Sequence, residues 1–274
     1  MITIKELKTI EEMEHVQQLE YQVWGMPPIP THQTLTAVKN GGIIVGAYDG
    51  EKIVGFSYGF AGLKEGKSYL CSHMLGIDKS YRSQRIGERL KHAQREIAMS
   101  KGYELMSWTF DPLETRNGYL NLTKLNGICD TYSENCYGEM QDGFNKGLPS
   151  DRLELHWHLT SDYVNKQQQP QIQNAQPIAT MEFGEDDLPT LKTASLDHLT
   201  ADVYALPVPK DFQTLKATSQ QHAMHWRLAT RTVFQALFAQ GYAAVRIDQQ
   251  KQWNHYIFVK KETLPLGGSD YENY

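Results

Sequence analysis

Apolar residues recur along the first 160 residues with the period of strands in some segments and of helices in others. Residues 43–48 and 53–60 alternate as strands and are joined by Asp49-Gly50, a strong hairpin signal. Further strands are expected at residues 2–7, 69–77, 104–110 and 151–159, and helices at residues 11–24, 31–39, 86–101 and 113–125. This order predicts an α/β (α+β) fold: a mostly antiparallel central sheet with helices on both faces.

The second half of the chain forms a separate, smaller pattern. Residues 165–176 are polar, rich in Gln and interrupted by Pro170, which is typical of an inter-domain linker. We therefore expect a first domain over residues 1–164, a C-terminal α+β region over 177–262 and a tail over 263–274. In the C-terminal region a helix over 222–240 leads through Gly241-Tyr242 to a strand, much as residues 86–101 lead to Gly102-Tyr103. The C-terminal region is therefore either a degenerate repeat of half of the first domain, or it resembles that domain only because helices between strands commonly end in Gly.

Composition restricts the class of protein. The chain has 274 residues, 40% of them hydrophobic, a net charge of -5 and three Cys. A charged N-terminus and the absence of a long apolar run predict a cytoplasmic protein with no signal peptide and no membrane span. The Cys spacing suits neither a disulfide framework nor a metal knuckle, so we expect no metal. An acidic pI of about 6.1 disfavours nucleic acid as a partner.

The most informative segment is the loop between the strand at 69–77 and the helix that follows. Residues 79–101 contain seven Lys or Arg and only two Glu in a chain that is acidic overall. A loop that enters a helix presents unpaired backbone N–H groups and the positive end of the helix dipole. The segment therefore suits one anionic ligand with a phosphate group.

The sequence of this loop, Arg82-Ser83-Gln84-Arg85-Ile86-Gly87, resembles motif A of the GCN5-related N-acetyltransferase (GNAT) superfamily, and the element order of residues 1–160 is similar too. The resemblance implies that acetyl-CoA is the cosubstrate. Its pyrophosphate would be held by the backbone of the loop, and its thioester by Leu75 and Ile77 of the preceding strand. Arg85 stands where the family usually has Gly, and Ser83 where Gly is common. We expect Arg85 either to have an ordinary φ and contact phosphate or to obstruct the site.

The resemblance also implies contacts from the helix at 113–125. An Asn near its start usually touches the pantetheine, and Arg116, Asn117 and Asn121 are the candidates. The position of the family's proton-donating Tyr is occupied by Thr123. Tyr119 and Tyr137 are the candidate substitutes for this general acid.

Two residues are candidates for the general base that an amine acceptor needs. His73 lies two residues before Leu75, but a hydrogen-bonded histidine at the edge of the core is the commoner role. Asp111 ends a strand, but Asp111-Pro112-Leu113-Glu114 is also a good helix start, with Asp111 as N-cap, and capping is favoured. Trp108 is expected in the core or in the wall of the acceptor pocket.

The leading hypothesis is an acyl-CoA-dependent N-acyltransferase that transfers acetyl directly from acetyl-CoA to an amine. The alternative is a non-catalytic GNAT-like domain that binds CoA or another protein, favoured by the altered Gly pattern and the missing Tyr. No G-x-x-x-x-G-K-[ST] motif is present, which excludes a P-loop enzyme. The acceptor, the acyl chain length and the oligomeric state stay open.

Overall fold

The computed structural model describes residues 1–140, 145–170, 172–251 and 253–267. The chain packs into two compact units. The N-terminal unit comprises Met1–Trp108 and His158–Thr160, and the C-terminal unit comprises Thr109–Trp157 and Ser161–Gly267. The domain boundary at residues 165–176 stays a prediction, but packing groups residues 109–157 with the C-terminal elements.

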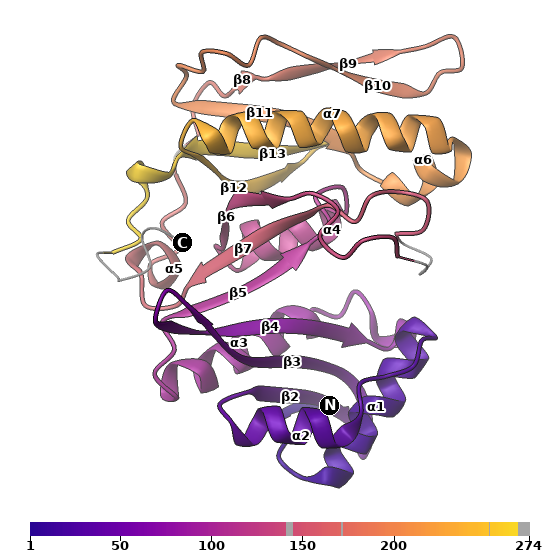
Figure 1. The fold of residues 1–274 in the computed structure, drawn as a ribbon, viewed down its shortest axis with the longest axis vertical. Coiled ribbons are helices and arrows are strands. Elements are labelled where there is room, and N and C mark those ends of the chain that lie inside the picture. The colour runs from indigo at the N-terminus through magenta and orange to yellow at the C-terminus, as the bar shows by residue number, and fades with distance from the viewer. Residues whose placement is uncertain (141–144, 171, 252, 268–274) are drawn as a thin grey trace. The chain divides into compact units, whose positions relative to one another are not determined.

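The N-terminal unit contains the motif strand and the motif helix, with the elements that the sequence predicts around them (Figure 1). In chain order its elements are β1 (Ile2–Glu6), α1 (Ile10–Trp24), α2 (Thr31–Lys39), β2 (Ile43–Asp49), β3 (Lys52–Lys64), β4 (Lys67–Ile77), the 3-10 turn η1 (Lys79–Tyr81), α3 (Ile86–Ser100) and β5 (Leu105–Phe110), whose last two residues belong to the C-terminal unit. Strands β1 to β4 pair antiparallel in sequence order, and β5 joins β4 in parallel.

Helices cover both faces of this sheet, as expected. On one face, Met13 and Val16 of α1 pack with Phe56 and Tyr58 of β3. On the other face, Ile86 and Leu90 of α3 lie against Gly55, where a Cβ would come within 3.2 Å of both side chains. Alternation along β3 separates the two layers because neighbouring strand residues point to opposite faces. The sheet therefore holds α3, and the loop before it, at a fixed place.

The C-terminal unit contains mostly antiparallel strands in the order β7-β6-β12-β13-β11-β8. In chain order its elements are α4 (Thr115–Gly118), the π-helix η2 (Tyr119–Lys124), β6 (Ile128–Ser133), β7 (Arg152–His158), α5 (Asp162–Asn165), β8 (Gln176–Pro177), β9 (Ala179–Phe183), β10 (Pro189–Thr193), β11 (Val203–Pro209), α6 (Phe212–Thr218), α7 (Gln220–Ala239), β12 (Tyr242–Gln249), β13 (Trp253–Lys260) and the 3-10 turn η3 (Lys261–Thr263). Only β8 is parallel to its neighbour, and β9 and β10 form a separate hairpin.

Helix α7 supplies the main core of this unit. Phe234 is fully buried, and its ring centroid lies 5.0 Å from that of Tyr256, 5.3 Å from that of Phe258 and 5.8 Å from that of Tyr132. Trp226 is also fully buried and donates its indole N–H to the Pro189 carbonyl over 2.8 Å. The apolar stripe of α7 is thus confirmed as a core face. The half-repeat stays a hypothesis.

Three expectations for this unit were wrong or incomplete. The helix expected over 113–125 begins two residues later, at Thr115, and continues from Tyr119 to Lys124 as a π-helix. Asp111 is therefore not the helix N-cap. The sequence pattern also missed β6, the β9–β10 hairpin and α6. In the predicted tail, Leu264 and Leu266 are buried, at 8% and 6% exposure, whereas residues 268–274 lie outside the described residues.

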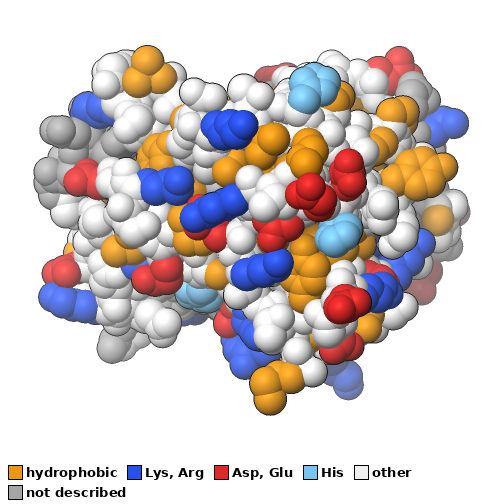
Figure 2. All heavy atoms as spheres, turned by 90° about the horizontal axis from the view of Figure 1, so that it is seen from below, with side chains coloured by type: hydrophobic (Ala, Val, Ile, Leu, Met, Phe, Trp, Pro, Cys, Tyr) orange, Lys and Arg blue, Asp and Glu red, His pale blue; other side chains and the backbone are white. Residues whose placement is uncertain are grey.

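Two features concern the surroundings of the protein. Within residues 1–140, 145–170, 172–251 and 253–267, no helix has the length and apolar character to cross a membrane. Figure 2 shows basic, acidic and apolar side chains intermingled on one face of the molecule.

Candidate active site

The loop before α3 has the backbone shape of a glycine-rich loop although it has other residues at the critical positions. Ser83 has φ 68° and Arg85 has φ 59°, so both adopt the left-handed conformation that glycine adopts most readily. The expectation that Arg85 would have an ordinary φ was therefore wrong. Its side chain is 69% exposed, and its Nε lies 3.2 Å from Glu88 Oε2. The guanidinium thus points along the first turn of α3 and does not fill the loop.

The start of α3 also differs from that of α1. Thr9 accepts a hydrogen bond from the Glu12 N–H and forms a capping box, whereas α3 has no side-chain cap. The first-turn N–H groups of a helix have no partner within the helix. Those of Ile86 and Gly87 therefore need an acceptor from outside α3. The exposed residues Arg82 and Gln84 complete this loop.

Strand β4 leads into the loop and pairs with its two neighbours over different lengths. Leu75 and Ile77 are opposite Ser57 and Gly55 of β3. On the other edge, the parallel ladder with β5 joins only Leu70 to Met106 and Cys71 to Ser107. Among the described residues, the second half of β4 therefore has no ladder partner on the β5 side. Its backbone groups on that edge, including those near Leu75 and Ile77, are placed to contact an extended ligand.

His73 stands in an irregular stretch of β4. The register shifts between the pairs Tyr58↔Met74 and Phe60↔Cys71, so β4 carries one extra residue there. The imidazole packs edge-on against Tyr58 and Phe60, with ring centroids 6.4 and 5.7 Å away. Burial of the ring lowers the pKa of His73 below its usual 6.5, although the residue as a whole is exposed. His73 is therefore neutral at pH 7 and has the protonation state of a base.

A buried lysine lies beside the same two strands, and sequence reasoning missed it. Lys91 of α3 is 2% exposed, and its Nζ donates to Ser72 Oγ over 2.8 Å and lies 3.5 Å from the centroid of the Trp108 ring. Burial lowers the pKa of Lys91 from 10.5 to about 7. A lysine in a basic helix is normally read as a solvated side chain, so the sequence carried no signal for it. Trp108 is 7% exposed, as expected for a core or wall residue.

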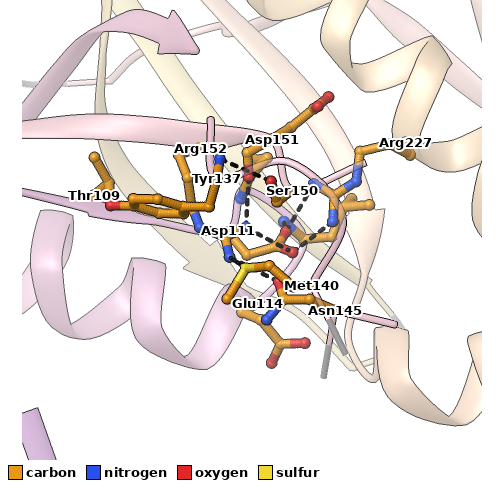
Figure 3. Close-up of polar contacts among 12 residues, drawn as sticks. Thr109, Asp111, Glu114, Tyr137, Met140, Asn145, Ser150, Asp151, Arg152 and Arg227 are labelled. Atoms are coloured by element: carbon orange, nitrogen blue, oxygen red, sulfur yellow. Dashed lines mark hydrogen bonds and ion pairs between the residues drawn. The ribbon is translucent and has the colours of Figure 1, made fainter. Parts of the chain in front are cut away.

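In the C-terminal unit, Asp111 belongs to a buried ion cluster (Figure 3). Its Oδ1 accepts from Arg227 Nη1 over 2.9 Å and from the Leu113 N–H over 2.8 Å, and its Oδ2 also accepts from Arg227 Nη2. Arg152 approaches the same carboxylate to 3.7 Å. The bidentate arginine occupies both oxygens of the carboxylate. This arrangement favours a structural role for Asp111 over the role of a base.

The same cluster fixes the segment that carries Tyr137. Arg152 donates to Asn145 Oδ1 over 2.7 Å, and its guanidinium carbon lies 5.5 Å from the centroid of the Tyr137 ring. The Tyr137 hydroxyl lies 2.7 Å from Thr109 Oγ1 at the end of β5. Tyr137 is 51% exposed, so its hydroxyl is both positioned and accessible. The role of Tyr137 as a general acid stays a prediction.

The remaining candidates lie on or near α4 and the π-helix. Asn117 is exposed and Tyr119 is half-buried, with Lys124 Nζ 5.6 Å from its ring centroid. Asn121 is 1% exposed, and neither of its amide atoms has a hydrogen-bond partner within the described chain. Glu114 points away from the ion cluster (Figure 3), and burial raises its pKa despite a hydrogen bond from Gln213. The roles of Asn117, Tyr119 and Asn121 stay predictions.

The described residues contain no group of three or more His, Cys, Asp or Glu side chains that could hold a metal ion. No disulfide joins Cys71, Cys129 or Cys136, all of which lie within the described residues.

Comparison with known proteins gives a family for the N-terminal part. Residues 10–118 match the model of the acetyltransferase (GNAT) family. No curated protein matches the chain.

Solved structures that are similar include the ribosomal-protein-S18-alanine N-acetyltransferase from Escherichia coli, at 14% identity, covering 58% of this chain and 94% of that one, with a TM-score of 0.45. An N-acetyltransferase from Staphylococcus aureus Mu50 has 15% identity, 58% and 99% coverage and a TM-score of 0.47. The putative acetyltransferase yncA from Salmonella typhimurium, solved with its cofactor acetyl-CoA, has 10% identity, 58% and 94% coverage and a TM-score of 0.47.

The family match spans the motif loop, α3 and β4, which the structure arranges as the resemblance implied. Residues 10–118 of this chain belong to the acetyltransferase (GNAT) family.

Proposed function

We propose that this protein is an acyl-CoA-dependent N-acyltransferase that transfers an acetyl group from acetyl-CoA to an amine. The observation that carries the proposal is the loop from Arg82 to Gly87. It has two left-handed residues in a row of six and leads into a helix without a side-chain cap. Backbone N–H groups in such a loop converge on an anion, here the pyrophosphate of CoA.

Strand β4 supplies the next part of the binding site. Beyond Cys71 it does not pair with β5, so its backbone groups near Leu75 and Ile77 are available to the pantetheine and the thioester carbonyl. A backbone N–H at the carbonyl oxygen would stabilise the negative charge that develops during attack by the amine.

His73 would act as the general base. The protonated amine acceptor has a pKa near 10.4 and must lose a proton before its nitrogen can attack the thioester carbon. Burial against two aromatic rings keeps His73 neutral at pH 7, so it can accept that proton. The C–S bond then breaks and the CoA thiolate takes up a proton.

Calorimetric titration with CoA tests the binding step. Arg85→Ala should weaken binding by about 1.5–3 kcal/mol, because the exposed guanidinium can leave Glu88 and hydrogen-bond to phosphate. Arg85→Gly loses the same guanidinium but relieves the left-handed strain, so it should bind more tightly than Arg85→Ala. Lys39→Ala, an exposed basic residue at the end of α2, is the control and should bind as the wild type does. Equal affinity in all four proteins would remove the loop as the cofactor site.

A thiol-release assay with acetyl-CoA and a panel of amines tests the chemical step. His73→Gln should lower kcat by roughly 10^2- to 10^4-fold while CoA affinity stays unchanged. In the wild type, the loss of kcat/KM that comes from protonation of His73 should occur at a lower pH than for an ordinary histidine, since burial lowers the pKa of His73. If CoA binds but no amine releases thiol, the non-catalytic CoA-binding alternative is correct.

A further inference from the structure

The side chain of Lys91 lies where β4 and β5 stop pairing. The last ladder pair is Cys71 with Ser107, and the next residue on each strand is Ser72 or Trp108. Lys91 contacts both of them: its Nζ donates a 2.8 Å hydrogen bond to Ser72 Oγ and lies 3.5 Å from the centroid of the Trp108 ring. All of these residues belong to the N-terminal unit. One side chain of α3 therefore connects the two strands at the point where they part.

A hydrogen-bond chain holds this lysine in place. Ser72 Oγ donates to Gln94 Oε1, which also accepts from Ser57 Oγ over 2.9 Å. Gln94 Nε2 donates to the Ile43 carbonyl over 3.3 Å. Lys91 and Gln94 lie three residues apart on α3 and so face the sheet together. The position of the amine is therefore set by three strands, and the stem of Lys91 cannot easily move aside.

A buried lysine is an unusual choice for this place. No ion pair joins Lys91 to a carboxylate within the part of the chain that the structure describes, so burial of the amine costs stability. A leucine at this position would fill the space without that cost, but it could not donate a hydrogen bond to Ser72. Groups that are unfavourable for stability concentrate at functional sites. The position of Lys91 beside β4 indicates which function this is.

We propose that Lys91 determines the size of the acyl group, by closing the inner end of the acyl-binding region so that only a short acyl group such as acetyl or propionyl fits. This inference rests on the proposed function, in which the thioester lies along β4 past Cys71. The methylene stem of Lys91 occupies the space between Ser72 and Trp108, and the hydrogen bond to Ser72 prevents it from yielding to a longer chain. Lys91 is in this sense a specificity-determining residue for the donor.

The test measures Kd by calorimetry for acetyl-, propionyl-, butyryl-, hexanoyl- and succinyl-CoA, which requires no knowledge of the acceptor. The wild type should bind hexanoyl-CoA at least tenfold more weakly than acetyl-CoA, since hydrophobic pockets discriminate by about tenfold or more per methylene. Lys91→Ala should reduce this ratio by about tenfold or more. Lys91→Met keeps the length of the side chain and should leave the ratio within about threefold of the wild type.

Leu90→Ala is the matched control for loss of packing. Leu90 is a fully buried neighbour on α3 that packs over Gly55, away from β5, so its truncation should not change the acyl ratio. If Lys91→Ala does not fold, Lys91→Val replaces it in the same comparison.

The outcomes separate the two proposals. If the wild type binds CoA and acetyl-CoA but Lys91→Ala keeps the wild-type ratio, the Lys91 inference is wrong and the proposed function stands. A preference for succinyl-CoA that Lys91→Met abolishes would also overturn it, because Lys91 would then recognise a carboxylate rather than limit size. If the wild type binds no CoA at all, the proposed function fails, and the inference fails with it.

Discussion

The two units contain buried charged side chains that have opposite surroundings. In the N-terminal unit, Lys91 is buried beside hydroxyl groups and an aromatic ring, and its pKa is lowered to about 7. In the C-terminal unit, burial by itself would lower the pKa of Arg227, but its bidentate pairing with Asp111 leaves that pKa raised. A buried group keeps its charge when a partner of opposite charge and matching geometry replaces water.

A second pair in the C-terminal unit follows the same rule. His156 is 1% exposed and lies 3.2 Å from Asp130 and 3.4 Å from Glu154. Burial lowers the pKa of His156, but the two carboxylates outweigh it and the pKa is raised. The comparison teaches that an ion pair preserves the charge of a buried group, whereas Lys91, which has no ion pair within the described residues, can change its protonation state near neutral pH.

The largest expected effect comes from breaking the paired cluster. Asp111→Ala leaves Arg227 buried without its partner and should lower the free energy of unfolding by about 3–5 kcal/mol. Urea denaturation at pH 7 measures this. Glu134→Ala removes a half-exposed partner of Arg231 and should cost about 1 kcal/mol or less. The double variant Asp111→Leu/Arg227→Met should recover part of the loss, since it removes the unpaired charge of Arg227 but leaves Arg152 without the carboxylate that it approaches to 3.7 Å.

The same series decides between the two roles of Asp111. Asp111→Asn with wild-type stability but a large loss of kcat and a changed pH profile would make Asp111 a base and contradict the structural role. Loss of stability with unchanged kcat in the folded fraction is the result that the cluster predicts.

Replacing Lys91 should have a smaller effect on the free energy of unfolding, and this effect should depend on pH. The pKa of Lys91 is about 7 in the folded protein and about 10.5 when unfolded, so between these values the unfolded chain binds more protons. Stability therefore rises with pH in this window, and below pH 7 the full cost of burying the amine is present. Lys91→Met has no such cost, so its stability advantage over the wild type should shrink by about 2 kcal/mol from pH 7 to pH 9.

Urea denaturation of both proteins at the two pH values measures this change, and titrations shared by both proteins cancel in the difference. Lys39→Met, at an exposed position, should give the same difference from the wild type at both pH values. If the difference in free energy of unfolding between Lys91→Met and the wild type is the same at pH 7 and pH 9, Lys91 is not desolvated, and the structure is contradicted on this point.

Much of the N-terminal unit could be predicted because its signals are local. The period of apolar residues gave β2, α1 and α2 nearly to the residue, and Asp49-Gly50 gave the hairpin. The predicted start of the helix at 113–125 was wrong because Asp111 does not cap it: α4 begins at Thr115, after Glu114. Asp111 instead pairs with Arg227, which is 116 residues away in the chain. Strand β6 was not predicted because apolar and polar residues do not alternate clearly along it.

The sequence by itself determined the element order of residues 1–110, the position of the loop between β4 and α3 and the resemblance of this loop to motif A. These depend on periodicity and on residues close in the chain. Only the tertiary structure decided that Ser83 and Arg85 adopt a glycine-like backbone, that Asp111 is held by two arginines and that Lys91 is buried where β4 and β5 part. Burial and pairing depend on residues brought together from distant segments, and a charged residue in the sequence does not show whether folding will leave it in water.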